Sequence, residues 1–279
     1  MIASTSLLIT AAWLRDANPQ QQASSEGQLL RHGLRHAGAS GRALHWITRN
    51  TAGSAFLRWA ERHALPGIAA HYRWRKRMIE TWAQDALRNG VRQVVVLGAG
   101  LDSLPVRLAL QHSRGQVLEI DRTDAMRLKT RALEASFGLP ANLRLLPADL
   151  STGRVMDVLG SCDAFDPTRP TLVIAEGLLM YLPKSQAIRT ARELSTSLAP
   201  GSCVIATAMQ VDARGHIGFQ GQPHWLGTWL RRSGEPFRWG IPQHGIAGAL
   251  QRVGLRLQAL ADPAHDPCPG EWVFLTKPC

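Results

Sequence analysis

Glycines and acidic residues recur at the ends of hydrophobic runs in the second half of the chain. Gly98 and Gly100 lie in one turn and are followed by Asp102, and Glu119 and Asp121 come about 20 residues later. Glycines let a ligand approach the backbone closely, and a carboxylate at the later position accepts hydrogen bonds from both hydroxyls of a ribose. This pattern predicts that the two glycines and the two later acids bind an adenosine-containing ligand.

Two further acids follow the next hydrophobic runs. Asp149 precedes Leu150, an arrangement that suits the amino group and the ring face of adenine. Glu176 precedes Gly177 and is placed to hold an ammonium group. The negative charge of Asp102 would repel a pyrophosphate bound at this turn. Asp102 suits a cationic or polar ligand instead. The third glycine of the dinucleotide fingerprint is missing, which disfavours a nucleotide dehydrogenase.

The elements that position these residues follow from hydrophobic patterning. Apolar runs alternate with helical segments from residue 91 onward, and this alternation is typical of a sheet covered on both faces. It predicts an α/β, Rossmann-like, doubly wound and mostly parallel seven-stranded sheet, with ligands at the carboxyl ends of its strands. The expected strands are 91–97, 116–120, 142–146, 171–175, 202–208, 255–260 and 272–276.

Two segments do not follow the strand–helix alternation. Residues 1–90 show only helical spacing, so they are expected to form an N-terminal helical cap over the substrate, with 91–279 as the sheet domain. Residues 209–240 fit neither period, and a lid insertion is expected there before the last two strands. Trp225, Arg231 and Trp239 of this insertion would suit a flat or acidic substrate. Equally, these side chains could pack the lid onto the sheet.

The composition sets limits on function. The chain has 279 residues and a net charge of +11, and 12 basic but only 5 acidic residues lie in residues 1–90. Such placement suits an anionic acceptor under the cap better than a nucleic acid. No apolar run of about 18 residues is present, so no membrane span is expected. The four cysteines lack metal-ligand spacing and predict no metal site, and no basic segment marks a secretion signal, so a cytoplasmic protein is expected.

Four patterns in order, LGAGLDS, LEIDR, PADL and AEGLLMYLP, resemble the leucine carboxyl methyltransferase family of class I S-adenosylmethionine enzymes. Its bacterial members include polyketide carboxyl O-methyltransferases. The resemblance extends from about residue 70 to the end of the chain and implies S-adenosyl-L-methionine as cofactor. It implies that Gly98 approaches the methionine part, Asp121 the ribose, Asp149 and Leu150 the adenine, and Glu176 the amino group.

The resemblance also implies an arginine before the first strand that pairs with the cofactor carboxylate. Arg73, Arg75 and Arg77 are candidates, and the spacing places Arg73 and Arg77 on one helix face and Arg75 on another. The family pattern favours Arg75. Leu104-Pro105 stands where the family usually has an arginine, whereas Arg107 is retained.

The expected reaction is methyl transfer to oxygen. A carboxylate acceptor is already ionised at neutral pH and needs no general base, whereas a hydroxyl would require one. Tyr181 is the candidate catalytic or substrate-lining residue, and His216 is a second candidate base. The sequence thus predicts an O-methyltransferase for a small or carrier-linked acid. Alternatives are hydroxyl methylation, another reaction with the same cofactor and, less favoured, a nucleic-acid methyltransferase.

Overall fold

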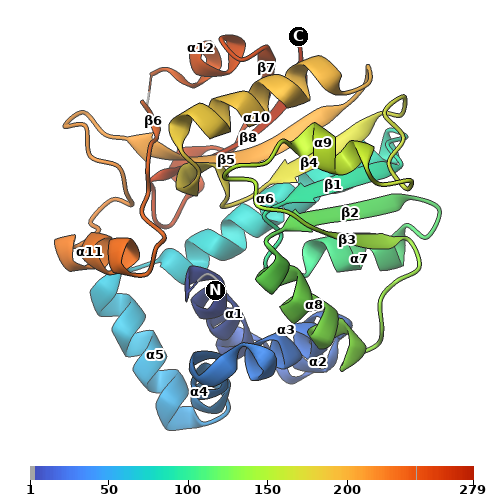
Figure 1. The fold of residues 1–279 in the computed structure, drawn as a ribbon. Helices are drawn as coiled ribbons and strands as arrows, with labels where there is room; N and C mark the ends of the chain where they lie inside the picture. The colour runs from blue at the N-terminus through green and yellow to red at the C-terminus, as the bar shows by residue number, and fades with distance from the viewer. Residues whose placement is uncertain (1–3, 243) are drawn as a thin grey trace.

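The computed structural model describes residues 4–242 and 244–279, which form a central sheet with helices on both faces (Figure 1). The strand order is β3-β2-β1-β4-β5-β8-β7, and β8 runs antiparallel to both of its neighbours. The fold prediction is therefore confirmed. The strands are β1 Gln93–Leu97, β2 Gln116–Asp121, β3 Leu143–Pro147, β4 Thr171–Ala175, β5 Cys203–Val211, β6 Ile241–Pro242, β7 Leu255–Leu260 and β8 Glu271–Pro278.

The sheet has eight strands rather than the predicted seven. The additional strand is β6, which pairs with the end of β5 through two residues only. Two residues are too few to show a period in the sequence. β5 is also longer than predicted and runs to Val211, so the insertion begins after that residue rather than at Met209.

Helices precede, separate and follow the strands. Before β1 they are α1 Ser4–Asp16, α2 Pro19–Ala23, α3 Ser25–His36, α4 Gly38–Thr48, α5 Thr51–Ala64 and α6 Ile68–Arg88. After β1 they are α7 Leu104–Gln111, α8 Thr123–Glu134, α9 Val155–Gly160, α10 Lys184–Ser197, α11 His224–Arg232 and α12 Ile246–Gln251, with short 3-10 turns η1 Leu179–Tyr181 and η2 Pro263–His265.

Alternate residues of β1 serve the two faces of the sheet. Val94 and Val96 belong to the core beneath α6 and α7, whereas Val95 and Leu97 belong to the core beneath α9 and α10. All five residues of β1 are buried, as expected for a central parallel strand that is covered on both sides. The acids that follow these strands are therefore brought to one edge of the sheet.

The helices α1 to α5 lie together on one side of the molecule, below the sheet in the view of Figure 1. Leu7 and Leu14 of α1 pack with Leu34 of α3 and with Leu128 of α8. This apolar cluster ties the N-terminal helices to the helix that follows β2.

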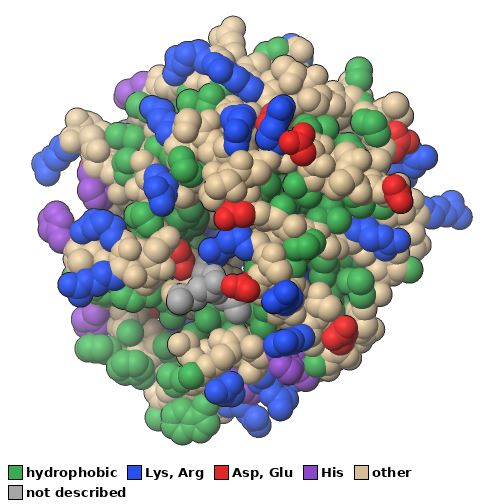
Figure 2. Space-filling model, viewed as in Figure 1, with side chains coloured by type: hydrophobic (Ala, Val, Ile, Leu, Met, Phe, Trp, Pro, Cys, Tyr) green, Lys and Arg blue, Asp and Glu red, His purple; other side chains and the backbone are tan. Residues whose placement is uncertain are grey.

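Figure 2 shows Lys and Arg side chains spread over the visible face, with acidic side chains among them. They do not form one continuous stripe on this face. Among the described residues, no helix combines the length and apolar character that crossing a membrane requires.

Candidate functional site

A cavity of about 890 Å³ lies at the carboxyl ends of β1 to β4. Its walls come from the loops after these strands, from α1 and the start of α3, from the first half of α6 and from the insertion after β5. Ligand pockets of roughly 300–1,000 Å³ are typical of small-molecule sites. The cavity therefore has room for a cofactor and an acceptor together.

The turn after β1 forms one wall of the cavity. Gly98 and Gly100 have φ values of 69° and 50°, a region that favours glycine. A methyl group at Gly98 would lie 2.9 Å from Leu178 Cδ1, so the turn leaves no room for a side chain. The Asp121 carboxylate accepts hydrogen bonds from the Gly100 N–H (2.7 Å) and the Arg122 N–H (2.6 Å). These bonds fix Asp121 at the cavity wall.

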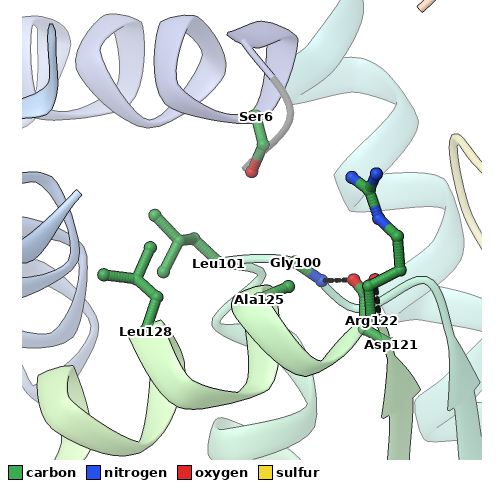
Figure 3. A pocket seen from close by; sticks show the side chains of 7 residues that line it. All are labelled: Ser6, Gly100, Leu101, Asp121, Arg122, Ala125 and Leu128. Atoms are coloured by element: carbon green, nitrogen blue, oxygen red, sulfur yellow. Dashed lines mark hydrogen bonds between the residues drawn. The ribbon is translucent and has the colours of Figure 1, made fainter. Parts of the chain in front are cut away.

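Asp121 also borders a small pocket of about 30 Å³, closed from above by Ser6 of α1 (Figure 3). The close-up shows the Ser6 hydroxyl directed toward the Gly100–Leu101 turn. The N-terminal helix thus reaches the place where the sequence predicted a ribose.

Asp149 and Leu150 line the same cavity at the end of β3. Hydrogen bonds from Ser151 lower the pKa of Asp149, so this carboxylate is ionised at neutral pH. Leu150 is buried and belongs to the apolar core beneath α9. An acid beside an apolar side chain is the arrangement that the sequence predicted for adenine.

Glu119 does not line the cavity, so the structure does not bring it together with the other residues predicted to bind the cofactor. Its side chain is fully buried and forms an ion pair with Lys129 of α8. Lys129 Nζ also donates to the Asp102 carbonyl oxygen at 2.6 Å. Glu119 lies two residues inside β2, where α8 covers it, whereas Asp121 is at the open end of the strand. Burial raises the pKa of Glu119 to about 7.

The three arginines of α6 all line the cavity, but they differ in burial and in their ion-pair partners. Arg75 is buried, and its guanidinium donates to Glu176 (2.8 Å) and to Glu271 (2.8 Å). Arg73 is half exposed and pairs with Asp16 at 2.8 Å. Arg77 is exposed and has no ion pair within the described part of the chain.

Behind Arg75 lies a buried histidine that connects two acids. His71 Nδ1 is 2.7 Å from Asp266 Oδ1, and Nε2 is 2.8 Å from Glu271 Oε2. Burial lowers the pKa of His71, but the two acids raise it by more, so its net pKa lies above the ordinary value. Burial likewise opposes the ionisation of Glu271, yet Arg75 and His71 bring its pKa down to about 2. Glu271 is therefore a carboxylate held between the Arg75 guanidinium and the His71 imidazole.

Lys76, the residue next to Arg75, carries a second cation into the site. Its Nζ lies 2.6 Å from Asp102 Oδ2 and 2.8 Å from Glu176 Oε2. Glu176 therefore contacts two cations of α6, and the Gly177 N–H that follows donates to Thr207. The contacts of Lys76, His71 and Glu271 were not predicted from the sequence.

The other end of the cavity is apolar and aromatic. Tyr181 packs against Phe237 with ring centroids 5.7 Å apart, and Phe237 lies 6.1 Å from Phe219. Arg238 follows on the rim, where its N–H donates to the Met180 carbonyl oxygen at 2.9 Å. Its side chain is exposed and has no ion pair among residues 4–242 and 244–279. This is the end of the cavity that an acceptor with an apolar body and a negative charge would fit.

Three of the predicted substrate residues lie elsewhere. Trp225 and Arg231 are on α11 and do not line the cavity; Trp225 is 57% exposed, and Arg231 bonds to Thr228. Trp239 Nε1 donates to the Leu179 carbonyl oxygen, and its ring packs on the core. The structure does not bring these three residues to the cavity, because the chain turns inward at 233–238, between α11 and Trp239. His216 is exposed and lies outside the cavity as well.

The insertion and α1 meet across the cavity. The Glu235 carboxylate accepts hydrogen bonds from the Thr5 N–H (3.1 Å), the Thr5 hydroxyl and the Ser4 N–H. A carboxylate at a helix N-terminus is favourable because the exposed N–H groups there carry partial positive charge. Glu235 is thus a capping residue that connects the insertion to the N-terminal helices.

The sheet order and the acids at its strand ends fit the S-adenosylmethionine-dependent methyltransferase fold that the sequence predicted. The chain aligns over its full length with a solved structure of a DUF574 family protein from Streptomyces avermitilis, covering 98% of that chain with a TM-score of 0.57 and 16% identity. At this identity the likeness supports the fold alone.

The match of the sequence to a protein family shows which family the chain belongs to. Residues 22–195 match the leucine carboxyl methyltransferase family, and the chain belongs to it. A protein of Mycolicibacterium smegmatis assigned to the S-adenosyl-L-methionine-dependent methyltransferases is 38% identical over 139 residues, or 50% of this chain and 43% of the relative. A protein of the same class from Mycolicibacterium paratuberculosis is 34% identical over 158 residues, 56% of this chain and 51% of the relative. These matches span about half the length of the curated relatives.

Proposed function

We propose that this protein transfers a methyl group from S-adenosylmethionine to the carboxylate of a small molecule or of a carrier-linked acid. In this proposal residues 1–90 cover the acceptor, residues 91–279 bind the cofactor, and the protein acts in the cytoplasm. Bound S-adenosylmethionine would supply a methyl group on a positively charged sulfur, which is an electrophile for in-line displacement.

The residues present fit this cofactor. Asp121, fixed by the Gly100 N–H, would accept from the ribose hydroxyls, and Asp149 with Leu150 would hold the adenine. Arg75 uses Nε, Nη1 and Nη2 for its two acids, and a guanidinium has two further N–H donors for a carboxylate. The positive φ of Gly98 exposes backbone rather than a side chain to the methionine part.

The observation that carries the choice of a carboxylate is the lack of a general base at the acceptor end. Among the described residues that line the cavity, none is a histidine or a cysteine. Burial raises the pKa of Tyr72 to about 12 and the pKa of Tyr181 still further, so neither phenol is ionised at neutral pH. A carboxylate acceptor needs no proton removed, because carboxyl groups ionise near pH 4.

The acids of the cavity support the same choice, since each already accepts hydrogen bonds within the protein. Glu235 caps α1, Glu80 pairs with Arg107 and Glu26 accepts from Ser103. The aromatic end would hold the body of the acceptor and exclude water. Arg238, which has no ion pair within the described part of the chain, would attract the negative charge of the acceptor. Proximity and desolvation are then the main contributions of the protein.

The test has two stages. Calorimetry with S-adenosylhomocysteine first measures cofactor binding, and absence of binding would remove the proposal. Labelled methyl transfer is then measured over a panel of apolar acids, each paired with its alcohol or phenol. We expect base-labile methyl esters from the acids only, at a rate that changes little between about pH 6 and 9 because no base titrates.

Arg238→Ala and Arg231→Ala form a matched pair for the acceptor end. Each removes one exposed arginine of the insertion, but only Arg238 lines the cavity. We expect Arg238→Ala to raise the KM for the acid about tenfold and Arg231→Ala to leave it unchanged.

Cofactor binding without methylation of any acid in the panel would instead favour hydroxyl methylation or a different reaction.

A further inference from the structure

Two acids of the cavity already hold an ammonium group. Asp102 lies in the turn after β1 and Glu176 follows β4, and Lys76 Nζ is within 2.8 Å of a carboxylate oxygen of each. Burial alone would raise the pKa of Asp102, but the contact with Lys76 outweighs it and the net pKa is lowered. The two carboxylates and the lysine therefore form a charged bridge across the cavity wall.

These are two acids that the sequence predicted to suit a cationic ligand. Both line the cavity beside the glycine turn, and the ammonium of Lys76 is chemically the same group as the ammonium of an amino acid. A primary ammonium has three donors, and this one directs two of them to the same pair of carboxylates that a ligand would reach. The Lys76 ammonium thus makes the contacts that the ammonium group of such a ligand would make.

Lys76 differs from Arg75 in how firmly it is held. The Arg75 side chain is 7% exposed and is bridged to Glu271, which His71 fixes from behind. The Lys76 side chain is 30% exposed, and the acid pair is its only ion-pair partner in the described chain. A lysine is a point charge on a flexible four-carbon stem, so it can leave these acids without moving the helix.

We propose that the ammonium of Lys76 occupies the subsite for the amino group of S-adenosylmethionine and is displaced when the cofactor binds. This inference rests on the proposed function, because it assumes that the cofactor enters this cavity. Arg75 stays in place as the partner of the cofactor carboxylate, whereas Lys76 competes with the cofactor for Asp102 and Glu176. The contacts of Lys76 with Asp102 and Glu176 must therefore break before the cofactor can bind.

The experiment compares two ligands that differ in the amino acid part. S-adenosylhomocysteine carries the ammonium and no charge on sulfur, and 5′-methylthioadenosine lacks the amino acid altogether. Calorimetry on wild type and Lys76→Met is expected to show S-adenosylhomocysteine binding about tenfold tighter in the variant, or about 1.4 kcal/mol. The affinity for 5′-methylthioadenosine is expected to stay the same.

Two further variants serve as controls. Lys184→Met removes the same charge from an exposed residue that does not line the cavity, and should leave both affinities unchanged. Lys76→Arg keeps a cation near the acids and should bind S-adenosylhomocysteine less tightly than Lys76→Met. Lys76→Gln repeats the test if circular dichroism shows that the methionine variant is misfolded.

The outcomes separate this inference from the proposed function. Unchanged or weaker S-adenosylhomocysteine binding in Lys76→Met would overturn the displacement, while wild-type binding would still support a cofactor site. An equal gain for both ligands would also overturn it, because the effect would not depend on the ammonium. If wild type binds neither ligand, the proposed function fails and this inference fails with it.

Discussion

The buried pair of Glu119 and Lys129 permits a sharp prediction, because the structure gives Glu119 a different role from the one its position suggests. Both side chains are fully buried. Removing one partner of a buried ion pair costs about 3–5 kcal/mol, whereas replacing both with apolar groups is often neutral. We therefore expect Lys129→Met to lower the free energy of unfolding by about 3–5 kcal/mol at pH 8, and Glu119→Leu with Lys129→Met to restore most of it.

The loss of unfolding free energy in Lys129→Met should depend on pH. The pKa of Glu119 is about 7 in the fold against an ordinary value near 4.5, a difference that corresponds to about 3 kcal/mol. A carboxyl with a raised pKa favours the folded state when protonated, so its contribution falls as the pH rises from 4.5 to 7. Without Lys129, Glu119 must take up a proton or remain a lone buried charge. The cost of Lys129→Met should therefore be smaller at pH 5 than at pH 8.

Urea unfolding at pH 5 and pH 8, followed by tryptophan fluorescence, measures these differences. Lys184→Met is the matched control, since Lys184 is exposed and should change the unfolding free energy by less than about 0.5 kcal/mol. If the loss of unfolding free energy in the double variant equalled the sum of the losses in the two single variants, the ion pair would be refuted.

Calorimetry completes the test with a variant that keeps an acceptor for Lys129. Glu119→Gln should leave the affinity for S-adenosylhomocysteine unchanged, because Glu119 does not line the cavity. A tenfold loss of affinity with unchanged stability would show that Glu119 contacts the cofactor after all, and would refute the assignment made from the structure.

Three other substitutions have defined outcomes. Asp121→Ala should weaken S-adenosylhomocysteine binding about 10- to 100-fold by calorimetry, because hydrogen bonds to a charged group contribute about 1.5–3 kcal/mol. Gly98→Ala should lower the melting temperature and the cofactor affinity, because the new methyl group would lie 2.9 Å from Leu178 at a φ of 69°. Glu271→Gln should lose about 3 kcal/mol of stability at pH 7 and less as the pH falls from 4.5 toward 2, because the pKa of Glu271 is about 2 and its stabilisation, complete above pH 4.5, is lost progressively over that range. Urea titrations at pH 7 and pH 3.5 would contradict this if the two losses were equal.

The sheet and its acids were predictable because their signals are local. Each parallel strand is a short apolar run, and the residue after it is brought to the same edge as its neighbours. Asp121, Asp149 and Glu176 therefore meet in one cavity although 55 residues separate the first from the last. Glu119 was mistaken for one of them because a one-dimensional pattern does not show which strand residue lies beneath a helix.

The acceptor end was not predictable in this way. Its residues come from the insertion, whose path is set by contacts that carry no period. Phe237 and Arg238 line the cavity because the Arg238 N–H bonds to the Met180 carbonyl oxygen. Trp225 was favoured for its side-chain type alone, yet α11 turns it to solvent. Composition shows which chemistry an insertion offers but not which of its residues face inward.

The choice among Arg73, Arg75 and Arg77 could have been narrowed from the sequence by a physical rule. His71, Arg75, Ile79, Ala83 and Leu87 are spaced four apart, so each lies beside the next along one row that winds slowly around α6, and all five are buried. An apolar row that continues into a histidine and an arginine predicts that these two are buried as well. A buried charge is tolerated only when it is paired, so acids from distant segments must meet that row. Arg73 and Arg77 lie off this row and are exposed, which is why the buried acids Glu176 and Glu271 hold Arg75.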